Sequence, residues 1–444
     1  MINYKLFSIY IYIYIYRIDM DEIIKLERLL KQYFKIINEA VDDATKQQLP
    51  QPQQQQPPQP AAPKIIRFIG AGGFGCVFSP PTTLTPIVKQ EYPDPDIKEI
   101  DIETYDDKYI AKILNCKEYS YKKELEKHQI IMKIDPTHQY TPKMIFAGYM
   151  DRQALMNSIE EKKQTNIDLY NCLNDKLRSD TNKFYGYIIY NKVGKSLDKL
   201  EKNDINKSNI KEVLINFSAG IRDFINNLYN ENLTHGDIKT PNMTLKNNKI
   251  YFIDFGLTHK SSNLDEVLNY SINYNYPIIL HLFRVIYNSI DNKKYKKEFY
   301  LDYIDNDKYL KKSFILDYLD YHMKTLISQH QFSIFKNIEE VKTYFKTYIK
   351  QLLIKLDDNN KYTKEEVYKL CFSEIAKNID IYSLSLALYH LFFNNLYKDL
   401  SLSNLVTSET LQLISTLFRD ALYNTIKNPI ELANRLDNII KTIK

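Results

Sequence analysis

Apolar and polar residues alternate in short runs from about residue 65, and these runs predict strands before helices. Ile69–Phe78 is expected to form a strand, a glycine turn and a returning strand, and Tyr109–Leu114 a further short strand. Apolar side chains then recur at helical spacing over Tyr119–Ile134, directly before Asp135-Pro136. The pattern therefore predicts a β-hairpin followed by a strand and a helix.

The first 63 residues differ in composition from the rest of the chain. Residues 1–19 contain an Ile-Tyr repeat, and the stretch Leu6–Tyr16 around it is too short to span a membrane as a helix, because its eleven residues rise only about 16 Å against a hydrocarbon core of about 30 Å. We interpret them as a low-complexity leader, with Met20 as the alternative start. Residues 20–46 have the spacing of an amphipathic helix, which packs on its own domain or on a partner, and residues 47–63 form a Gln/Pro linker.

Four polar residues in the motifs HGDIKTPN and DFG carry the candidate chemistry: Asp237, Lys239, Asn242 and Asp254. A phosphoryl-transfer site must position a hydroxyl and neutralise the charge on the moving phosphoryl group. Asp237 is expected to accept or orient the hydroxyl proton, with Lys239 against the phosphate. Asn242 and Asp254 are expected to hold Mg²⁺, which prefers oxygen ligands.

A glycine-rich turn joins the first two predicted strands. Its backbone N–H groups are expected to approach phosphates, and the nucleotide-binding residues proposed here are Gly70, Gly72, Phe74, Gly75 and Val77. A dinucleotide-binding fold also uses spaced glycines, but it needs a helix directly after them. Here a β-prone segment and Pro80-Pro81 follow, so the hairpin interpretation is favoured.

Lys112 lies within the third predicted strand, with apolar residues on both sides. Such a lysine either reaches solvent at a sheet edge or is buried against a phosphate and a partner acid, and we favour the second arrangement after a glycine hairpin. Glu124 and Glu126 of the following helix both qualify as the partner. Glu124 is preferred, because apolar residues then share its side of the helix.

These motifs resemble those of the eukaryotic-type protein kinase family over roughly residues 65–444. The resemblance implies a bilobal α+β fold with a small β-rich N-lobe and a larger helical C-lobe. The expected kinase domain covers residues 64–444, with the N-lobe at 64–190, the hinge at 191–195, the C-lobe at 196–444, and insertions at 150–183 and 281–372.

Two further residues match the family pattern. Tyr190 stands at the gatekeeper position, at the end of the expected fifth strand. Asp380 begins a segment that looks like the central buried helix of the C-lobe, and the resemblance implies that it accepts hydrogen bonds from the backbone of the catalytic loop. The resemblance also implies an ATP- and Mg²⁺-dependent serine/threonine protein kinase that phosphorylates protein hydroxyls.

The chain departs from the family pattern in two places. Gly236 replaces the arginine that most members carry, a variant similar to that of vaccinia-related kinases and of kinases of large DNA viruses. No Ala-Pro-Glu follows the DFG motif, and the arginine that usually pairs with that acid is missing as well. The glycine variant leads us to expect a viral kinase. Because the acid and the arginine are both missing, we expect that another arrangement replaces this ion pair.

Two other classes of protein share the same core motifs. A small-molecule phosphotransferase also carries a His-Gly-Asp loop with an Asn five residues after the Asp, but Lys239 argues against this class. A pseudokinase would act by binding alone. The complete set Lys112, Asp237, Asn242 and Asp254 argues against it.

Charge and cysteine content limit the expected partners. The net charge of +5, with 60 basic and 55 acidic residues, argues against a dedicated nucleic-acid binder. The four cysteines, at positions 76, 116, 172 and 371, show no paired or metal-type spacing, which suggests a reducing compartment. We expect a monomer without a membrane partner, in the host cytoplasm or in a virion.

Overall fold

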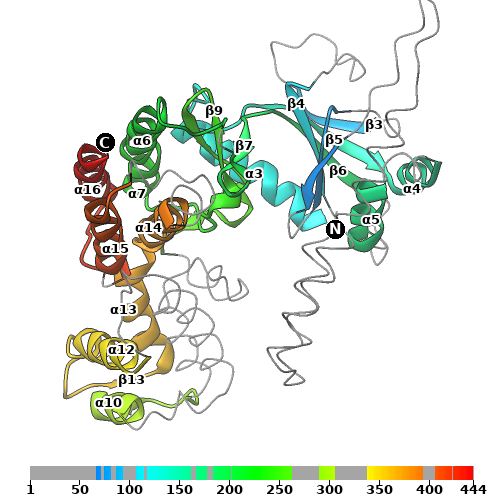
Figure 1. Ribbon diagram of the computed structural model, residues 1–444. Coiled ribbons are helices and arrows are strands. Elements are labelled where there is room, and N and C mark those ends of the chain that lie inside the picture. The colour runs from blue at the N-terminus through cyan, green and yellow to red at the C-terminus, as the bar shows by residue number, and fades with distance from the viewer. Residues whose placement is uncertain are drawn as a thin grey trace, which may run out of the picture. The chain divides into compact units, whose positions relative to one another are not determined.

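A computed structural model describes residues 67–71, 75–81, 87–93, 107–114, 118–161, 167–177, 184–201, 203–262, 290–305, 338–393, 406–422 and 424–443. The expected leader, amphipathic helix and linker, residues 1–63, lie outside these described residues. The unit Lys64–Lys444 has a mixed α+β fold with antiparallel sheet and helices (Figure 1). Over the described ranges, no helix has the length and hydropathy that a membrane span requires.

The largest sheet has six antiparallel strands in the order β1-β2-β4-β6-β5-β3. The strands are β1 (Arg67–Ala71), β2 (Gly75–Ser79), β3 (Ile87–Pro93), β4 (Tyr109–Leu114), β5 (Met144–Asp151) and β6 (Phe184–Asn191). The predicted hairpin and the strand around Lys112 are confirmed. The sequence did not indicate β3, which pairs with β5 at the edge of the sheet.

Side chains along β6 point alternately to the two faces of this sheet, and their contacts show which helix covers each face. Tyr185, Tyr187 and Ile189 belong to an apolar cluster that includes residues of α5 (Ile167–Leu177). Ile188 and Tyr190 belong to a second cluster that includes Tyr121 of α3 (Glu118–Ile134). Because neighbouring strand residues point to opposite faces, α3 covers one face and α5 the other. The helix predicted at 119–134 is confirmed as α3.

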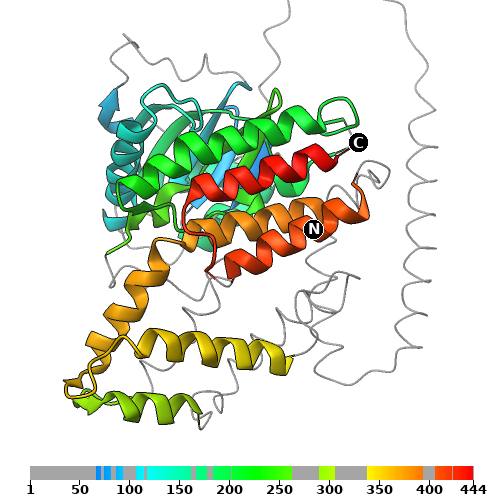
Figure 2. The ribbon, with the colours of Figure 1, turned by 90° about the vertical axis from the view of Figure 1, so that its left-hand side faces the viewer.

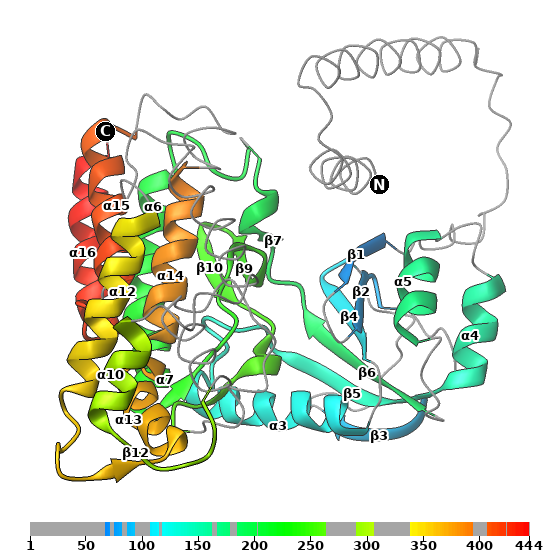
Figure 3. The same cartoon turned by 90° about the horizontal axis from the view of Figure 1, so that it is seen from below.

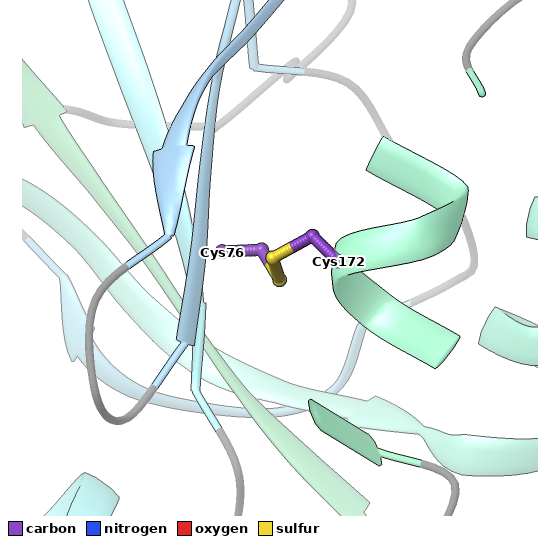
Figure 4. Close-up of a disulfide and its surroundings, with 2 residues drawn as sticks. All are labelled: Cys76 and Cys172. Carbon is purple, nitrogen blue, oxygen red and sulfur yellow. A yellow bond between two sulfur atoms is a disulfide. The ribbon is translucent and has the colours of Figure 1, made fainter. Parts of the chain in front are cut away.

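A disulfide connects Cys76 of β2 with Cys172 of α5, on the α5 face of the sheet (Figure 4). The two Cα atoms are 6.2 Å apart, and both side chains are buried in the apolar cluster. The expectation of unpaired cysteines is therefore wrong for this pair. The two cysteines are 96 positions apart in the sequence, so no local spacing could indicate the pairing. The argument for a reducing compartment rested on four unpaired cysteines, and two of them are paired.

Loss of this disulfide is expected to lower the free energy of unfolding by about 2–4 kcal/mol, because the bond restricts the unfolded chain. Urea unfolding of Cys172→Ala against the wild type would measure the change. Cys371→Ala is the matched control, since Cys371 is not part of this bond. A reductant should lower the unfolding midpoint of the wild type and of the control, but not that of Cys172→Ala. Equal wild-type midpoints with and without reductant would contradict the prediction.

A group of helices forms the second large core. Its members are α6 (Ile210–Gly220), the π-helical turn η3 (Ile221–Ile225), α7 (Asn226–Asn230), α14 (Ile379–His390), α15 (Ser408–Leu422) and α16 (Pro429–Thr442). Figures 2 and 3 show α6, α14, α15 and α16 side by side. Every residue from Ile379 to Tyr389 is buried, so α14 is the central helix that the sequence predicts there. The N-terminus of α16 is capped by Asn428, which accepts the Glu431 N–H, and Pro429 occupies its first turn.

The predicted insertion at 281–372 is described in part. It contributes β12 (Tyr295–Lys296), α10 (Lys297–Asp305), α12 (Ile338–Leu353), β13 (Lys361–Tyr362) and the first part of α13 (Lys364–Ala376). Thr363 and Glu366 form a capping box that fixes the start of α13. Leu352 and Leu353 of α12 are buried in the helical core, so this segment is an integral part of the unit. The insertion expected at 150–183 contains α4 (Arg152–Glu161) and α5.

Candidate active site

Lys112 reaches a partner acid because of its register in the sheet. It lies opposite Ile188 of β6, and Ile188 packs on the α3 side of the sheet. Residues opposite each other in an antiparallel pair share a face, so Lys112 also points toward α3. Its Nζ lies 2.7 Å from Oε1 of Glu124, and both side chains are buried. Glu126 is exposed, so the structure pairs Lys112 with the glutamate that the sequence favours.

The same ammonium group contacts a residue that follows 142 positions later in the chain. Lys112 Nζ lies 3.3 Å from Oδ1 of Asp254. Burial alone lowers the pKa of Lys112, but the charges of Asp254 and Glu124 outweigh it and raise the pKa, so Lys112 stays a cation. Lys112 in turn lowers the pKa of Asp254 and outweighs the opposite effect of burial. Asp254 therefore stays an anion at neutral pH.

A tight hairpin positions the two predicted metal ligands. It consists of β9 (Met243–Lys246) and β10 (Lys249–Phe252), and β9 also pairs with β7 (Lys195–Ser196). Asn247 and Asn248 connect the strands with φ angles of 51° and 61°, the left-handed values that a two-residue hairpin turn requires. Asn242 directly precedes β9, and its carbonyl accepts the N–H of Ile253 at 3.0 Å. The hairpin therefore brings Asn242 close to Asp254.

Asp254 lies two residues beyond the end of β10. Its φ of 64° and ψ of 69° are left-handed, a conformation that aspartate tolerates better than most residues do. The chain leaves the strand direction here and enters the 3₁₀ turn η5 (Phe255–Leu257). This bend directs the carboxylate toward Lys112, while Phe255 is buried in the helical core.

Asp237 is held by two neighbouring side chains. Lys239 donates to both of its carboxylate oxygens at 2.9 Å, and Asn242 Nδ2 donates to Oδ2 at 2.7 Å. Asn242 Nδ2 also donates to the Asp237 carbonyl at 2.9 Å. These two bonds fix the orientation of the amide and leave its oxygen as the atom that can coordinate a cation.

Asp380 of α14 anchors the loop that carries Asp237. Its carboxylate accepts the N–H of His235 at 2.7 Å and the N–H of Gly236 at 3.1 Å, which confirms the role expected from the sequence. Burial raises the pKa of Asp380, and the nearby His235 and the two N–H groups oppose that effect. The loop is therefore tied to α14, in which every residue from Ile379 to Tyr389 is buried.

The loop requires glycine at position 236. Its φ is +77°, and a Cβ atom there would lie 2.7 Å from the Leu257 carbonyl oxygen and 3.1 Å from the His259 ring. A side chain at this position would be strained and would also clash with backbone. The backbone conformation of this loop therefore requires the glycine at position 236.

The predicted nucleotide-binding residues are described in part. Gly72 and Phe74 lie outside the described residues. Gly70 is in β1, and Gly75 and Val77 are in β2, where Val77 lies opposite Lys112. A Cβ atom on Gly75 would lie 2.1 Å from the Ile113 carbonyl oxygen, so this glycine is needed for the approach of β2 to β4 as well as for the predicted contact with phosphate.

Thr244 fixes the predicted hinge, a role that no sequence pattern indicates. Its buried hydroxyl donates to the Val193 carbonyl at 2.7 Å and so connects β9 to the segment between β6 and β7. A threonine in a strand is ordinary, and no pattern distinguishes one that holds a distant backbone. The structure therefore links the hinge to the hairpin of the predicted metal ligands.

The chemistry of these side chains fits a magnesium nucleotide. Asn242 and Asp254 offer hard oxygen atoms, and Lys112 and Lys239 offer cations for phosphate oxygens. No group of three or more His, Cys, Asp or Glu residues in the described part could hold a metal ion alone, so a cation here would need oxygens from its ligand or from water. No protein-family model matches the chain, and no curated protein matches it either.

Proposed function

We propose that the chain is a Mg²⁺- and ATP-dependent serine/threonine protein kinase with a bilobal fold. The observation that carries the proposal is the contact of the Lys112 ammonium with both Glu124 and Asp254. This contact joins the six-stranded sheet to the end of the β9–β10 hairpin. A buried lysine shared by two acids is costly to maintain for stability alone, and it suits the binding of phosphate beside a cation.

Each residue of the site would have a separate role in phosphoryl transfer. Bound Mg²⁺ would neutralise charge on the phosphates, and Asn242 and Asp254 would hold it. Lys112 would bind phosphate oxygens of ATP. Asp237 would orient the acceptor hydroxyl and take its proton as the new oxygen–phosphorus bond forms and the bond to ADP breaks.

Lys239 supports the assignment to protein hydroxyls. Its Nζ is held on the Asp237 carboxylate, where it would lie beside the acceptor hydroxyl and the transferring phosphoryl group. It would neutralise charge there while the acceptor approaches. Residues 263–289 lie outside the described residues, so the assignment to protein hydroxyls rests on Lys239 and the sequence motif alone.

The decisive experiment incubates the purified full chain with Mg-ATP and a degenerate peptide library. We expect phosphate on serine and threonine, and none with Asp254→Asn. A parallel reaction with aminoglycosides and choline tests for a small-molecule phosphotransferase. Phosphorylation of those compounds alone, or of neither class, would overturn the proposal.

A further inference from the structure

The hairpin of β1 and β2 lies at one edge of the six-stranded sheet. Among the described strands β1 pairs with β2 alone, and β2 joins the hairpin to β4 through residues 75–78. The apolar cluster beneath α3 contains no described residue of β1 or β2. In the part of the chain that the structure describes, the apolar packing of this hairpin therefore comes from the α5 face.

Helix α5 covers the hairpin on that face and is bonded to it covalently. Cys76 and Phe78 of β2 are fully buried in the apolar cluster that includes α5, and Phe68 of β1 packs against the same cluster. The disulfide from Cys76 to Cys172 joins β2 directly to α5 (Figure 4). A segment that lies between β5 and β6 in the sequence thus holds the edge of the sheet.

The register of β2 connects this disulfide to the candidate active site. Cys76 lies opposite Ile113 of β4, and Val77 lies opposite Lys112. Because neighbouring strand residues point to opposite faces, Cys76 faces α5 while Val77 faces the side of Lys112. The neighbours of Cys76 in the chain are Gly75 and Val77, both predicted to contact the nucleotide. A restraint on Cys76 therefore also restrains the backbone of these two residues.

We propose that the Cys76–Cys172 disulfide positions β2 for the binding of Mg-ATP, with α5 as a clamp on the glycine hairpin. Cys172 is then a positioning residue that acts through Cys76. Asp237 and Asp254 lie on other elements, so the clamp acts on nucleotide binding and not on the transfer step. This inference rests on the proposed kinase function, because β2 carries residues predicted to contact the nucleotide.

The first test measures steady-state kinetics of the full chain before and after reduction with dithiothreitol. One thiolate of this dithiol attacks a sulfur of the disulfide, and the other cysteine leaves as a thiolate and takes a proton. The second thiol of the reagent then releases the first cysteine and closes a cyclic disulfide, so two electrons pass to the protein. KM for Mg-ATP should rise at least about threefold while kcat changes by less than about twofold, the pattern expected when binding alone is weakened.

Cys172→Ala should show the same rise in KM and no response to the dithiol. Reoxidation of the reduced wild type should restore its KM, a test that needs no variant to fold. An unchanged wild-type KM, after mass spectrometry confirms complete reduction, would overturn the inference. A fall in kcat with KM unchanged would overturn it as well.

Leu155→Ala is the matched control. Leu155 belongs to α4 and is fully buried in the same apolar cluster, so its truncation leaves a cavity and lowers stability. The disulfide stays intact in this variant, so its KM for Mg-ATP should match that of the wild type and should rise on reduction. If Cys172→Ala and Leu155→Ala raise KM equally, the disulfide contributes only general stability, and the inference fails.

A second measurement separates this inference from the proposed function. Amide hydrogen exchange, followed by mass spectrometry without nucleotide, needs no catalytic activity. Reduction should speed exchange in β2 at least about threefold and leave α16 unchanged, because only the hairpin loses its clamp. Faster exchange in a protein that binds no Mg-ATP would refute the proposed kinase and leave the clamp standing. Equal exchange in β2 before and after reduction would refute the clamp, whatever the activity.

Discussion

Replacement of Asp254 by alanine is expected to abolish phosphoryl transfer while the protein stays folded. The variant removes the carboxylate proposed as the principal Mg²⁺ ligand, and Lys112 keeps Glu124 as its partner. Peptide phosphorylation and a thermal unfolding curve would measure the two effects. The left-handed backbone at this position should make alanine less stable than asparagine by about 1 kcal/mol.

Asp254→Asn is the better test for that reason, because asparagine tolerates the same backbone conformation. Both variants should be inactive, and only the alanine variant should show a clear stability loss.

Asp237→Ala should lower kcat by about 10²–10⁴-fold, the usual contribution of a general base. Rates near that of the wild type in any of these purified variants would refute the proposed site.

Lys112→Met is expected to lower kcat/KM for Mg-ATP severely, by about 10²-fold or more, because a preorganised charge near the phosphates is lost. Glu124→Gln should act in the same direction, since an amide does not balance the buried ammonium. Steady-state kinetics over a range of Mg-ATP concentrations would show both effects.

Glu126→Gln is the matched control for Glu124→Gln. It makes the same chemical change two residues later on α3, at an exposed position. Its kinetics and its unfolding temperature should match those of the wild type. A greater loss of kcat/KM in Glu126→Gln than in Glu124→Gln would contradict the pairing of Lys112 with Glu124.

The parts of the site that the sequence predicts well depend on short-range periodicity. A strand of six residues fixes which side of the sheet Lys112 faces, and helical spacing separates Glu124 from Glu126. For Lys112 and Glu124 one local pattern was enough, whereas the role of Asp380 was implied by the family resemblance and not by a local pattern.

The features that the sequence did not predict depend on contacts between distant segments. The Cys76–Cys172 disulfide joins positions without any local signal, and the bond from Thr244 to Val193 joins a strand to a loop 51 residues earlier. The strand at 87–93 contains three consecutive polar residues, Lys89, Gln90 and Glu91, and pairs with β5 alone among the described strands. Such contacts follow from packing, which a single sequence does not reveal.

The backbone at Gly236 affects how such a loop could change during evolution. An arginine there would have to adopt a left-handed conformation, at a cost of about 1–2 kcal/mol, and its Cβ would collide with the Leu257 carbonyl. A single substitution to arginine would therefore leave a strained residue in this loop unless the segment from Leu257 to His259 moved as well. The glycine and the position of that segment thus depend on each other, so a change at one is expected to require a change at the other.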